Sequence, residues 1–250
     1  QLPYVVARAA AVGIFRILTI STSLRELAKL ISIAESYPAL YCTAGVHPHN
    51  SQSEGVNDPQ KILNQLDHKK IIGIGESGLD FHYDFSEIDC QRENFLSHIE
   101  ASRTTGLPLI IHSRDADDEM SETLQKELKK GEFPFILHCF TGGQKLADIA
   151  IELGGFISVS GIITFKNAGD LRSVIKTVPI ERLLIETDAP YLSPVPFRGA
   201  RNEPANLIYT FEELLKIKEC SQEDLAFHTT DNFFRLFTKM PKSDTSIEKN

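Results

Sequence analysis

The chain has 250 residues, of which 42% are hydrophobic and 24% are charged, and its formal net charge is -8. This composition is typical of a water-soluble globular protein, and the length suits one large domain. The acidic balance excludes a protein that coats nucleic acid regardless of sequence, because such binding depends on lysine and arginine neutralising phosphates. It does not exclude a nuclease, since bound divalent cations supply positive charge locally.

The cysteines and the apolar runs predict a cytoplasmic protein outside the membrane. Cys42, Cys90, Cys139 and Cys220 form no C-x-x-C pair, so we expect four reduced thiols. No stretch approaches the roughly 18 apolar residues that a membrane span requires. No signal peptide is visible in the sequence, and we expect a monomer in the cytoplasm.

Seven short apolar runs alternate with helical patterns along the chain. The runs are continuous rather than alternating, which predicts strands covered on both faces, as in a parallel sheet. Strands that alternate with helices predict a parallel α/β architecture, and an eight-stranded barrel requires one more strand. The predicted strands are residues 17–21, 40–46, 71–75, 108–112, 135–139, 156–160 and 182–186.

A helix predicted over residues 3–11 has no strand before it, so the strand missing from the barrel is the first. A second helix is predicted from Ser86, as its cap, to Gly106, which ends it, with Ile88, Phe95 and Ile99 on its apolar face.

The end of the chain is predicted to contain two helices and a tail. Pro204 lies near the start of one helix, and residues 221–238 form the last. We expect one barrel domain over residues 1–238, followed by a polar tail over residues 239–250.

Five of the seven predicted strands end at a side chain that binds metals. In a parallel barrel these ends converge on one mouth, where active sites lie. Imidazole and carboxylate together suit Zn, Mn or Fe, a carboxylate can bridge two ions, and such ions make a coordinated water a usable nucleophile at neutral pH. The five side chains are His47, Glu76, His112, His138 and Asp188.

Each of these residues alone has a simpler structural interpretation. A lone histidine at a strand end is commonly structural, and an aspartate after a strand is often a helix cap. The coincidence of position across several strands favours a metal site. For His49, which lies beside His47, we expect a solvent-exposed side chain.

The sequence contains two further motifs, each with a functional and a simpler interpretation. Residues 73–78 fit G-x-G-x-x-G, but no helical pattern begins there, so we expect these glycines to let backbone pass close to the metal centre rather than bind a dinucleotide. After the last strand, Arg198 and Arg201 lie in a long loop where barrels often bind phosphate. The simpler alternative is two solvated arginines.

Six segments of the sequence together resemble one family, the TatD family. They follow the family order from about the beginning of the first helix to the end of the last. The resemblance implies a TIM-type (β/α)8 barrel of the metal-dependent hydrolase superfamily. It also implies a cytoplasmic deoxyribonuclease that depends on divalent metals, often a 3′-to-5′ exonuclease on single strands. The segments are residues 45–49, 75–80, 111–115, 137–142, 186–192 and 198–204.

The resemblance also assigns site residues. The metal ligands fall on Glu76, His112, His138 and Asp188, with Glu76 bridging two ions of Mg, Mn or Zn. Asp188 and His47 are expected to be catalytic, with His47 near the scissile phosphate of single-stranded DNA.

Arg201 and Asn202 are assigned to substrate contact or loop ordering. One departure is clear, because the family begins with a strand that carries a His-x-His pair, and no such pair precedes the first helix of this sequence. This agrees with the missing first strand. Two alternatives therefore remain open: an amidohydrolase or esterase built on the same barrel, and a non-catalytic fragment.

Overall fold

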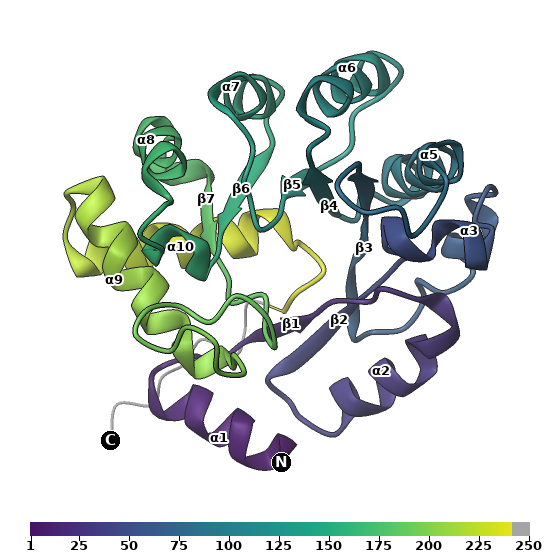
Figure 1. The fold of residues 1–250 in the computed structure, drawn as a ribbon. Coiled ribbons are helices and arrows are strands. Elements are labelled where there is room, and N and C mark those ends of the chain that lie inside the picture. The colour runs from purple at the N-terminus through teal and green to yellow at the C-terminus, as the bar shows by residue number, and fades with distance from the viewer. Residues whose placement is uncertain (242–250) are drawn as a thin grey trace.

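Seven parallel strands curl into an open barrel with helices around its outside (Figure 1). The structure is a computed structural model that describes residues 1–241, and the part of the predicted tail from 242 to 250 lies outside the described residues. The strands follow one another in chain order, and each pairs in parallel with the next. Among the described residues, no pairing joins the last strand to the first.

The strands are β1 (Ile17–Thr19), β2 (Leu40–Ala44), β3 (Ile71–Asp80), β4 (Leu109–Arg114), β5 (Phe135–Leu137), β6 (Phe156–Val159) and β7 (Leu183–Ile185). The helices are α1 (Leu2–Ala11), α2 (Leu27–Glu35), α3 (Ser51–Glu54), α4 (Gln60–Leu63), α5 (Ile88–Thr105), α6 (Asp117–Leu128), α7 (Gln144–Glu152), α8 (Gly169–Thr177), α9 (Leu207–Lys218) and α10 (Gln222–Leu236). All seven predicted strands are thus confirmed in position and in their parallel arrangement.

One strand is longer than the sequence predicts. β3 does not end before Glu76 but continues to Asp80. The reason is a bulge, because the register against β4 shifts between Ile74 and Ser77 and pairing then resumes. Glu76 therefore lies inside the strand. No helix begins after the glycine motif until α5, which agrees with the rejection of a dinucleotide site.

The sheet separates two apolar cores. The outer core lies between the sheet and the surrounding helices, and the inner core fills the closed side of the curl. Ile72, Ile110, Ile136 and Leu184 belong to the inner core, together with residues from the end of the chain. Their immediate neighbours in the strands belong to the outer core. This alternation follows from the two-residue period of a strand. Once one inward-facing residue of a strand is known, every second residue along that strand also faces inward.

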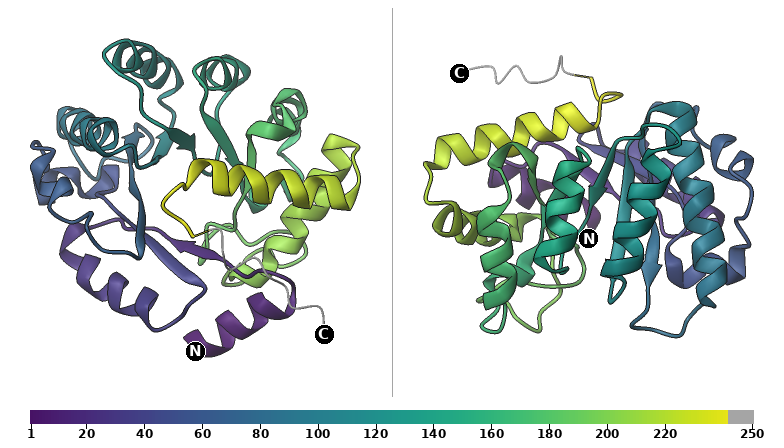
Figure 2. Two further views of the ribbon diagram at one scale, coloured as in Figure 1. Left: turned by 180° about the vertical axis from the view of Figure 1, so that it is seen from behind. Right: turned by 90° about the horizontal axis from the view of Figure 1, so that it is seen from above.

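The last helix closes one end of the barrel. Figure 2 shows α10 lying across the back of the sheet, opposite the view of Figure 1. Ser221 caps it, since its side chain accepts a hydrogen bond from the backbone N–H of Asp224. Met240 is buried in the inner core, and Lys239 donates hydrogen bonds to two backbone carbonyls. The packed part of the chain therefore extends past the predicted boundary at residue 238.

Helix α5 differs in part from its prediction. Phe95 and Ile99 are buried as expected, and Gly106 ends the helix in a left-handed conformation. Ser86 does not cap it, because its hydroxyl donates to the carbonyl of His49 and accepts from the backbone N–H of Gln52 in α3. Ile88 is 42% exposed, so it is not part of the buried face.

Glycines let the strands approach closely at the mouth of the barrel. A Cβ on Gly45 would lie 2.4 Å from the Cα of Gly75. A Cβ on Gly78, whose φ is +149°, would lie 2.0 Å from the carbonyl oxygen of His112. Both approaches are impossible for any other residue without moving backbone. The glycines of the G-x-G-x-x-G segment thus have a packing role beside the candidate site.

No helix among residues 1–241 combines the length and the apolar character needed to cross a bilayer.

We predict that Gly78→Ala destabilises the protein by about 2–4 kcal/mol, because it adds both a steric overlap with β4 and a strained φ. Urea unfolding measures the change. The matched control is Gly169→Ala at the start of α8, where no atom lies within 4 Å of the added Cβ. That substitution should be neutral or slightly stabilising. Equal stability of both variants would contradict the role assigned to Gly78.

Candidate metal centre

Three strands deliver polar side chains to one point inside the mouth of the barrel. His112 lies two residues after Ile110 in β4, so it occupies the same inner face one step nearer the mouth. His138 stands in the same relation to Ile136, directly after β5. Glu76 lies within the bulge in β3, where its backbone N–H donates to the carbonyl of Ser21. The apolar inner core therefore gives way to a polar cluster at the carboxyl ends of the strands.

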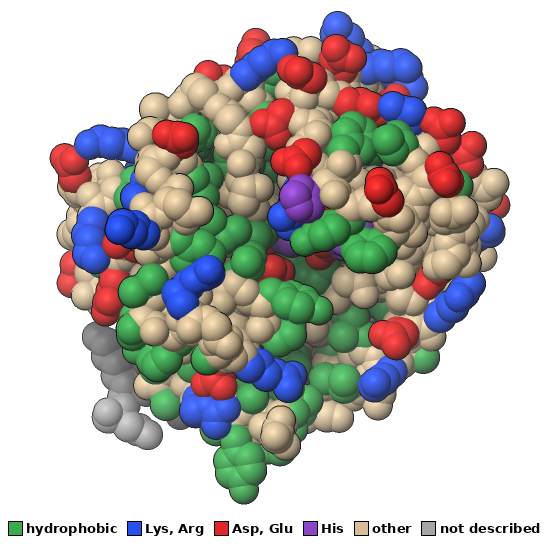
Figure 3. All heavy atoms as spheres, viewed as in Figure 1, with side chains coloured by type: hydrophobic (Ala, Val, Ile, Leu, Met, Phe, Trp, Pro, Cys, Tyr) green, Lys and Arg blue, Asp and Glu red, His purple; other side chains and the backbone are tan. Residues whose placement is uncertain are grey.

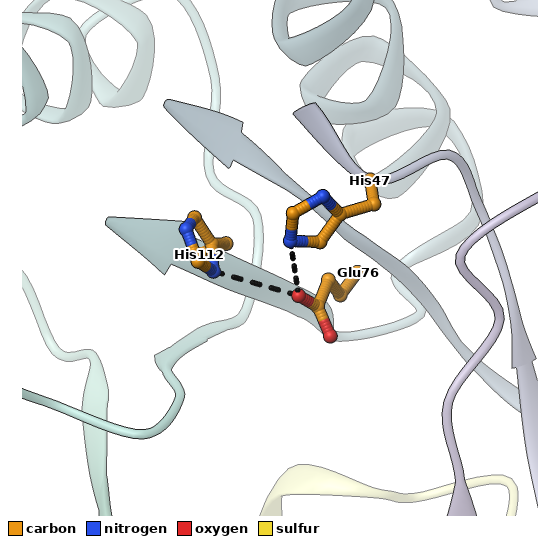
Figure 4. A group of neighbouring side chains, drawn as sticks. All are labelled: His47, Glu76 and His112. Atoms are coloured by element: carbon orange, nitrogen blue, oxygen red, sulfur yellow. Dashed lines mark ion pairs between the residues drawn. The ribbon is translucent and has the colours of Figure 1, made fainter. Parts of the chain in front are cut away.

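The carboxylate of Glu76 lies at the centre of this cluster (Figure 4). Its Oε1 is 3.0 Å from Nε2 of His47, 3.3 Å from Nε2 of His138 and 3.5 Å from Nδ1 of His112. Burial by itself would raise the pKa of Glu76, but the charge of His138 and the proximity of the other two imidazoles outweigh it. They hold the pKa of Glu76 well below its usual range. The carboxylate is therefore charged and depends on nearby positive charge.

Hydrogen bonds on the far side of each ring indicate which nitrogen faces Glu76. Nε2 of His112 donates to Oδ2 of Asp80 at 2.9 Å, and Nδ1 of His138 donates to Oε2 of Glu186 at 3.4 Å. In the neutral rings, both histidines then turn a lone pair toward Oε1 of Glu76. Nε2 of His138 is buried and makes no hydrogen bond with any described residue. Only a proton or a cation can separate these lone pairs from the carboxylate.

His47 differs from the other two histidines. Its Nδ1 accepts a hydrogen bond from the backbone N–H of His49, so its Nε2 carries the proton and donates to Glu76. One potential ligand atom from each of His47, Glu76 and His112 lies within 4.8 Å of the others. In this group His47 acts as a hydrogen-bond donor to Glu76 rather than as a metal ligand. This tautomer separates His47 from the candidate ligands.

Two carboxylates to which the sequence pattern assigned no role hold the imidazole rings in place. Asp80 accepts from both His112 and His49, and Glu186 accepts from His138 and from the backbone N–H of Cys139. Carboxylates behind metal-binding imidazoles fix the tautomer and raise the basicity of the ligand. The position of Asp80 could have been predicted from the sequence, because it lies four residues after Glu76 and therefore on the same face of an extended strand.

Asp188 lies three residues after β7 and adds a further carboxylate to the cluster. Burial raises its pKa to about 7, and the negative charges of Glu186 and Glu76 add to the rise against the opposing charge of His138. In the same way, nearby carboxylates outweigh burial and raise the pKa of His138 well above its usual value. The cluster thus holds more negative charge than its protein surroundings balance, which is the condition that a bound cation relieves.

The residues present fit a divalent cation. Glu76 offers a charged oxygen, His112 and His138 offer lone pairs beside it, and the orphaned Nε2 of His138 has no other use in the described residues. Imidazole and carboxylate are the donor types that Zn and Mn bind in proteins. Asp188 lies close enough for its charge to interact with these groups.

His49 is not solvent-exposed, which corrects its prediction. Its ring is half-buried, and Nε2 bonds to Oδ2 of Asp80 at 2.9 Å. Burial and the neighbouring His47 lower the pKa of His49, so its ring is neutral near pH 7. The physical reason is Asp80, which requires a donor and draws both His49 and His112 toward it.

A fully buried histidine fixes the segment that carries His47. The backbone N–H of Val46 donates to Nε2 of His98 at 3.0 Å, and Nδ1 of His98 donates to the carbonyl of Asn94 at 2.7 Å. The side chain of Asn94 donates to the carbonyl of Val46. Helix α5 thereby holds both backbone groups of the residue before His47. Burial lowers the pKa of His98 to about 4, so the ring stays neutral.

The long loop after β7 places its candidate residues differently from one another. Asn202 is 3% exposed, and its amide donates to the carbonyls of Thr187 and Tyr191 while its oxygen accepts from within the loop. That geometry fits loop ordering. Arg198 stacks on the ring of Phe165 at 3.6 Å, and Arg201 is exposed to solvent.

Comparisons with known proteins identify the family of the chain. The family described as TatD related DNase matches residues 1–238. The metal-dependent hydrolase YabD of Bacillus subtilis is 38% identical over 237 residues, covering 95% of this chain and 92% of its own length. The 3′-5′ ssDNA/RNA exonuclease TatD of Escherichia fergusonii is 33% identical over 239 residues, covering 93% and 91%. The crystal structure of YJJV, a TatD homologue of Escherichia coli K12, is 28% identical with a TM-score of 0.86, covering 96% and 92%.

We predict that Asp80→Asn weakens the binding of Zn²⁺ or Mn²⁺ by about 10- to 100-fold. One oxygen of Asp80 accepts from both imidazoles and the other accepts from two backbone N–H groups, so the amide nitrogen of asparagine would face donors at either position. Competition with a metal chelator measures the affinity. Asp118→Asn is the matched control, since Asp118 is exposed and pairs only with Lys145. Equal affinities for the two variants would contradict the positioning role of Asp80.

His98 predicts a dependence of stability on pH. Its pKa is about 4 in the folded protein and about 6.5 when unfolded, so the unfolded chain binds the extra proton between these values. The contribution of the neutral His98 ring to the free energy of unfolding is complete above pH 6.5. It is lost as the pH falls toward 4, and the loss is about 3 kcal/mol at most. In urea titrations from pH 7 to 4, His98→Gln should lose less stability than the wild type.

The control for this measurement is His228→Gln in α10, for which the wild-type slope is expected. An unchanged slope in His98→Gln would contradict the account of the buried neutral ring.

Proposed function

The chain belongs to the TatD related DNase family of metal-dependent hydrolases, and we propose that it hydrolyses phosphodiester bonds in single-stranded DNA. In this proposal residues 1–238 form one catalytic barrel that depends on two divalent ions of Mg, Mn or Zn. Digestion proceeds from the 3′ end. The similarity to the 3′-5′ ssDNA/RNA exonuclease TatD of Escherichia fergusonii supports this substrate and this polarity.

The observation that carries the proposal is the buried carboxylate of Glu76 facing two imidazole lone pairs. The carboxylate oxygen and one ring nitrogen each of His112 and His138 converge on one point, and Nε2 of His138 has no hydrogen-bond partner among residues 1–241. We assign Glu76, His112, His138 and Asp188 as the residues that would hold the two ions. Divalent ions bound there would polarise a phosphoryl oxygen and lower the pKa of a coordinated water.

The remaining polar groups act on the substrate. His47 keeps a proton on Nε2, so it can donate a hydrogen bond to an oxygen of the scissile phosphate when Glu76 turns toward the ions. Asp188 orients the attacking water and accepts its proton. Arg201 is exposed on the loop after β7 and contacts the DNA backbone, while Asn202 orders that loop.

We predict that the wild-type chain shortens 5′-labelled single-stranded DNA one nucleotide at a time in the presence of Mg²⁺ or Mn²⁺, and that a chelator stops the reaction. Glu76→Gln should lower kcat/KM by about a thousandfold, because bound ions contribute several kcal/mol of transition-state stabilisation. The matched control is Glu122→Gln on α6, an exposed position outside the site, which should retain activity.

A metal-loaded and folded chain that leaves DNA intact would contradict the proposal. If the same preparation hydrolysed members of an amide and ester panel, the amidohydrolase or esterase alternative would replace it. Metal uptake without turnover of any substrate would identify a non-catalytic protein.

A further inference from the structure

Two aromatic side chains remain in solvent beside the candidate metal centre. Tyr83 and Phe85 lie in the loop between β3 and α5, where they are 40% and 64% exposed. Their rings are stacked, with centroids 5.3 Å apart and planes inclined by 27°. Aromatic surface left in water at the edge of a polar site is surface available to a ligand.

The stack is continuous with the histidines of the centre. The ring of Phe85 lies 4.7 Å from that of His49, and His49 lies 4.3 Å from His47, which lies 4.6 Å from His112. Figure 3 shows histidine and hydrophobic side chains side by side in the middle of the face that Figure 1 presents. A row of rings therefore leads from solvent to the candidate metal ligands.

The loop that carries the stack is held at both ends. Oδ1 of Asp80 accepts hydrogen bonds from the backbone N–H groups of His82 and Tyr83, at 3.0 Å and 3.2 Å. At the other end, Ser86 donates to the carbonyl of His49. Its own carbonyl accepts from the buried side chain of Gln91. The same carboxylate, Asp80, thus orients a histidine of the centre and the backbone of Tyr83. A platform fixed in this way loses little conformational freedom on binding.

A positive charge lies against the same stack. The guanidinium of Arg114, at the end of β4, is 5.0 Å from the centroid of the Tyr83 ring. Arg114 is exposed, and no carboxylate within residues 1–241 forms an ion pair with it. Planar guanidinium groups bind phosphate oxygens and stack on aromatic rings. The stack therefore presents an apolar face and a free cation together, which matches a nucleobase and its phosphate.

We propose that Tyr83 and Phe85 form a stacking subsite for the nucleobase next to the scissile phosphate, with Arg114 contacting an adjoining phosphate. This inference rests on the proposed nuclease function and names the part of the substrate that the site recognises. Any base can stack on an aromatic face, so the subsite is tolerant of sequence. It requires an unpaired strand, because bases within a duplex already stack on their neighbours and must be unstacked at a cost.

The test compares a single-stranded oligonucleotide that carries bases with an abasic oligomer of the same length. Binding is measured by fluorescence anisotropy in a Glu76→Gln background, which prevents digestion. The chain with an intact stack should bind the base-carrying strand more tightly than the abasic one by about 5- to 150-fold. The pair Tyr83→Ala and Phe85→Ala should remove most of that preference.

Two variants separate stacking from a structural effect. Tyr83→Phe keeps the ring and should keep the preference for bases. Phe227→Ala removes an equally exposed aromatic ring on α10, at the far end of the barrel, and should leave the preference unchanged. Arg114→Gln should weaken binding of both oligomers and reduce the salt dependence of that binding.

The outcomes distinguish this inference from the function on which it rests. If the double alanine variant keeps its preference for bases, or if the intact chain shows none, the stacking subsite is overturned. That outcome leaves the digestion of DNA by the wild type unaffected. If the preference depends on Tyr83 and Phe85 but the wild type releases no nucleotides, the subsite stands as a binding site and the nuclease proposal fails.

Discussion

The buried carboxylate of Glu76 is the constraint on which the rest of the site depends. A charge removed from water is costly unless opposite charge or several hydrogen bonds surround it. Three imidazoles from three different segments lie around it, and two of them turn lone pairs toward it. The arrangement is therefore stable only with protons or a cation at its centre. The close packing of β2, β3 and β4, which the glycines permit, brings the rings of His47 and His112 to this oxygen atom, and His138 reaches it from the end of β5.

The inner face of the sheet changes character along its length. At one end Ile110, Ile136 and Leu184 fill the barrel under α10. Two residues further along, the same face carries His112 and His138. The two-residue period of a strand converts a packed apolar base into a polar mouth without any change in the sheet. A rigid base of this kind suits the candidate metal ligands, because their strands cannot shift independently.

Carboxylates behind the rings complete the arrangement. Asp80 links the centre to the aromatic loop, since one of its oxygens accepts from His112 and the other from the backbone of Tyr83. One oxygen of Glu186 accepts from Nδ1 of His138, and the other accepts from the backbone N–H of Cys139. Groups that contact no metal therefore determine which nitrogen of each ring is available.

Much of this could be predicted from the sequence, and the parts that could not have physical reasons. Apolar runs located all seven strands, because strands covered on both faces leave a continuous apolar signal. The extension of β3 to Asp80 was missed, since the run is interrupted by glycines and the bulge breaks the period. With the strand ended too early, Asp80 had no place on the inner face. The burial of His49 and the loop contact of Ser86 depend on partners distant in sequence, which local patterns do not encode.

The most direct test of the central claim is to locate a metal ion by anomalous diffraction in crystals of the chain grown with Mn²⁺. The account predicts a peak within about 2 Å of Glu76 Oε1, Nδ1 of His112 and Nε2 of His138. It also predicts that His47 keeps its hydrogen bond from the backbone of His49 and lies outside the coordination shell. A peak bound through His47 instead of His138, or no peak at Glu76 at saturating Mn²⁺, would contradict it.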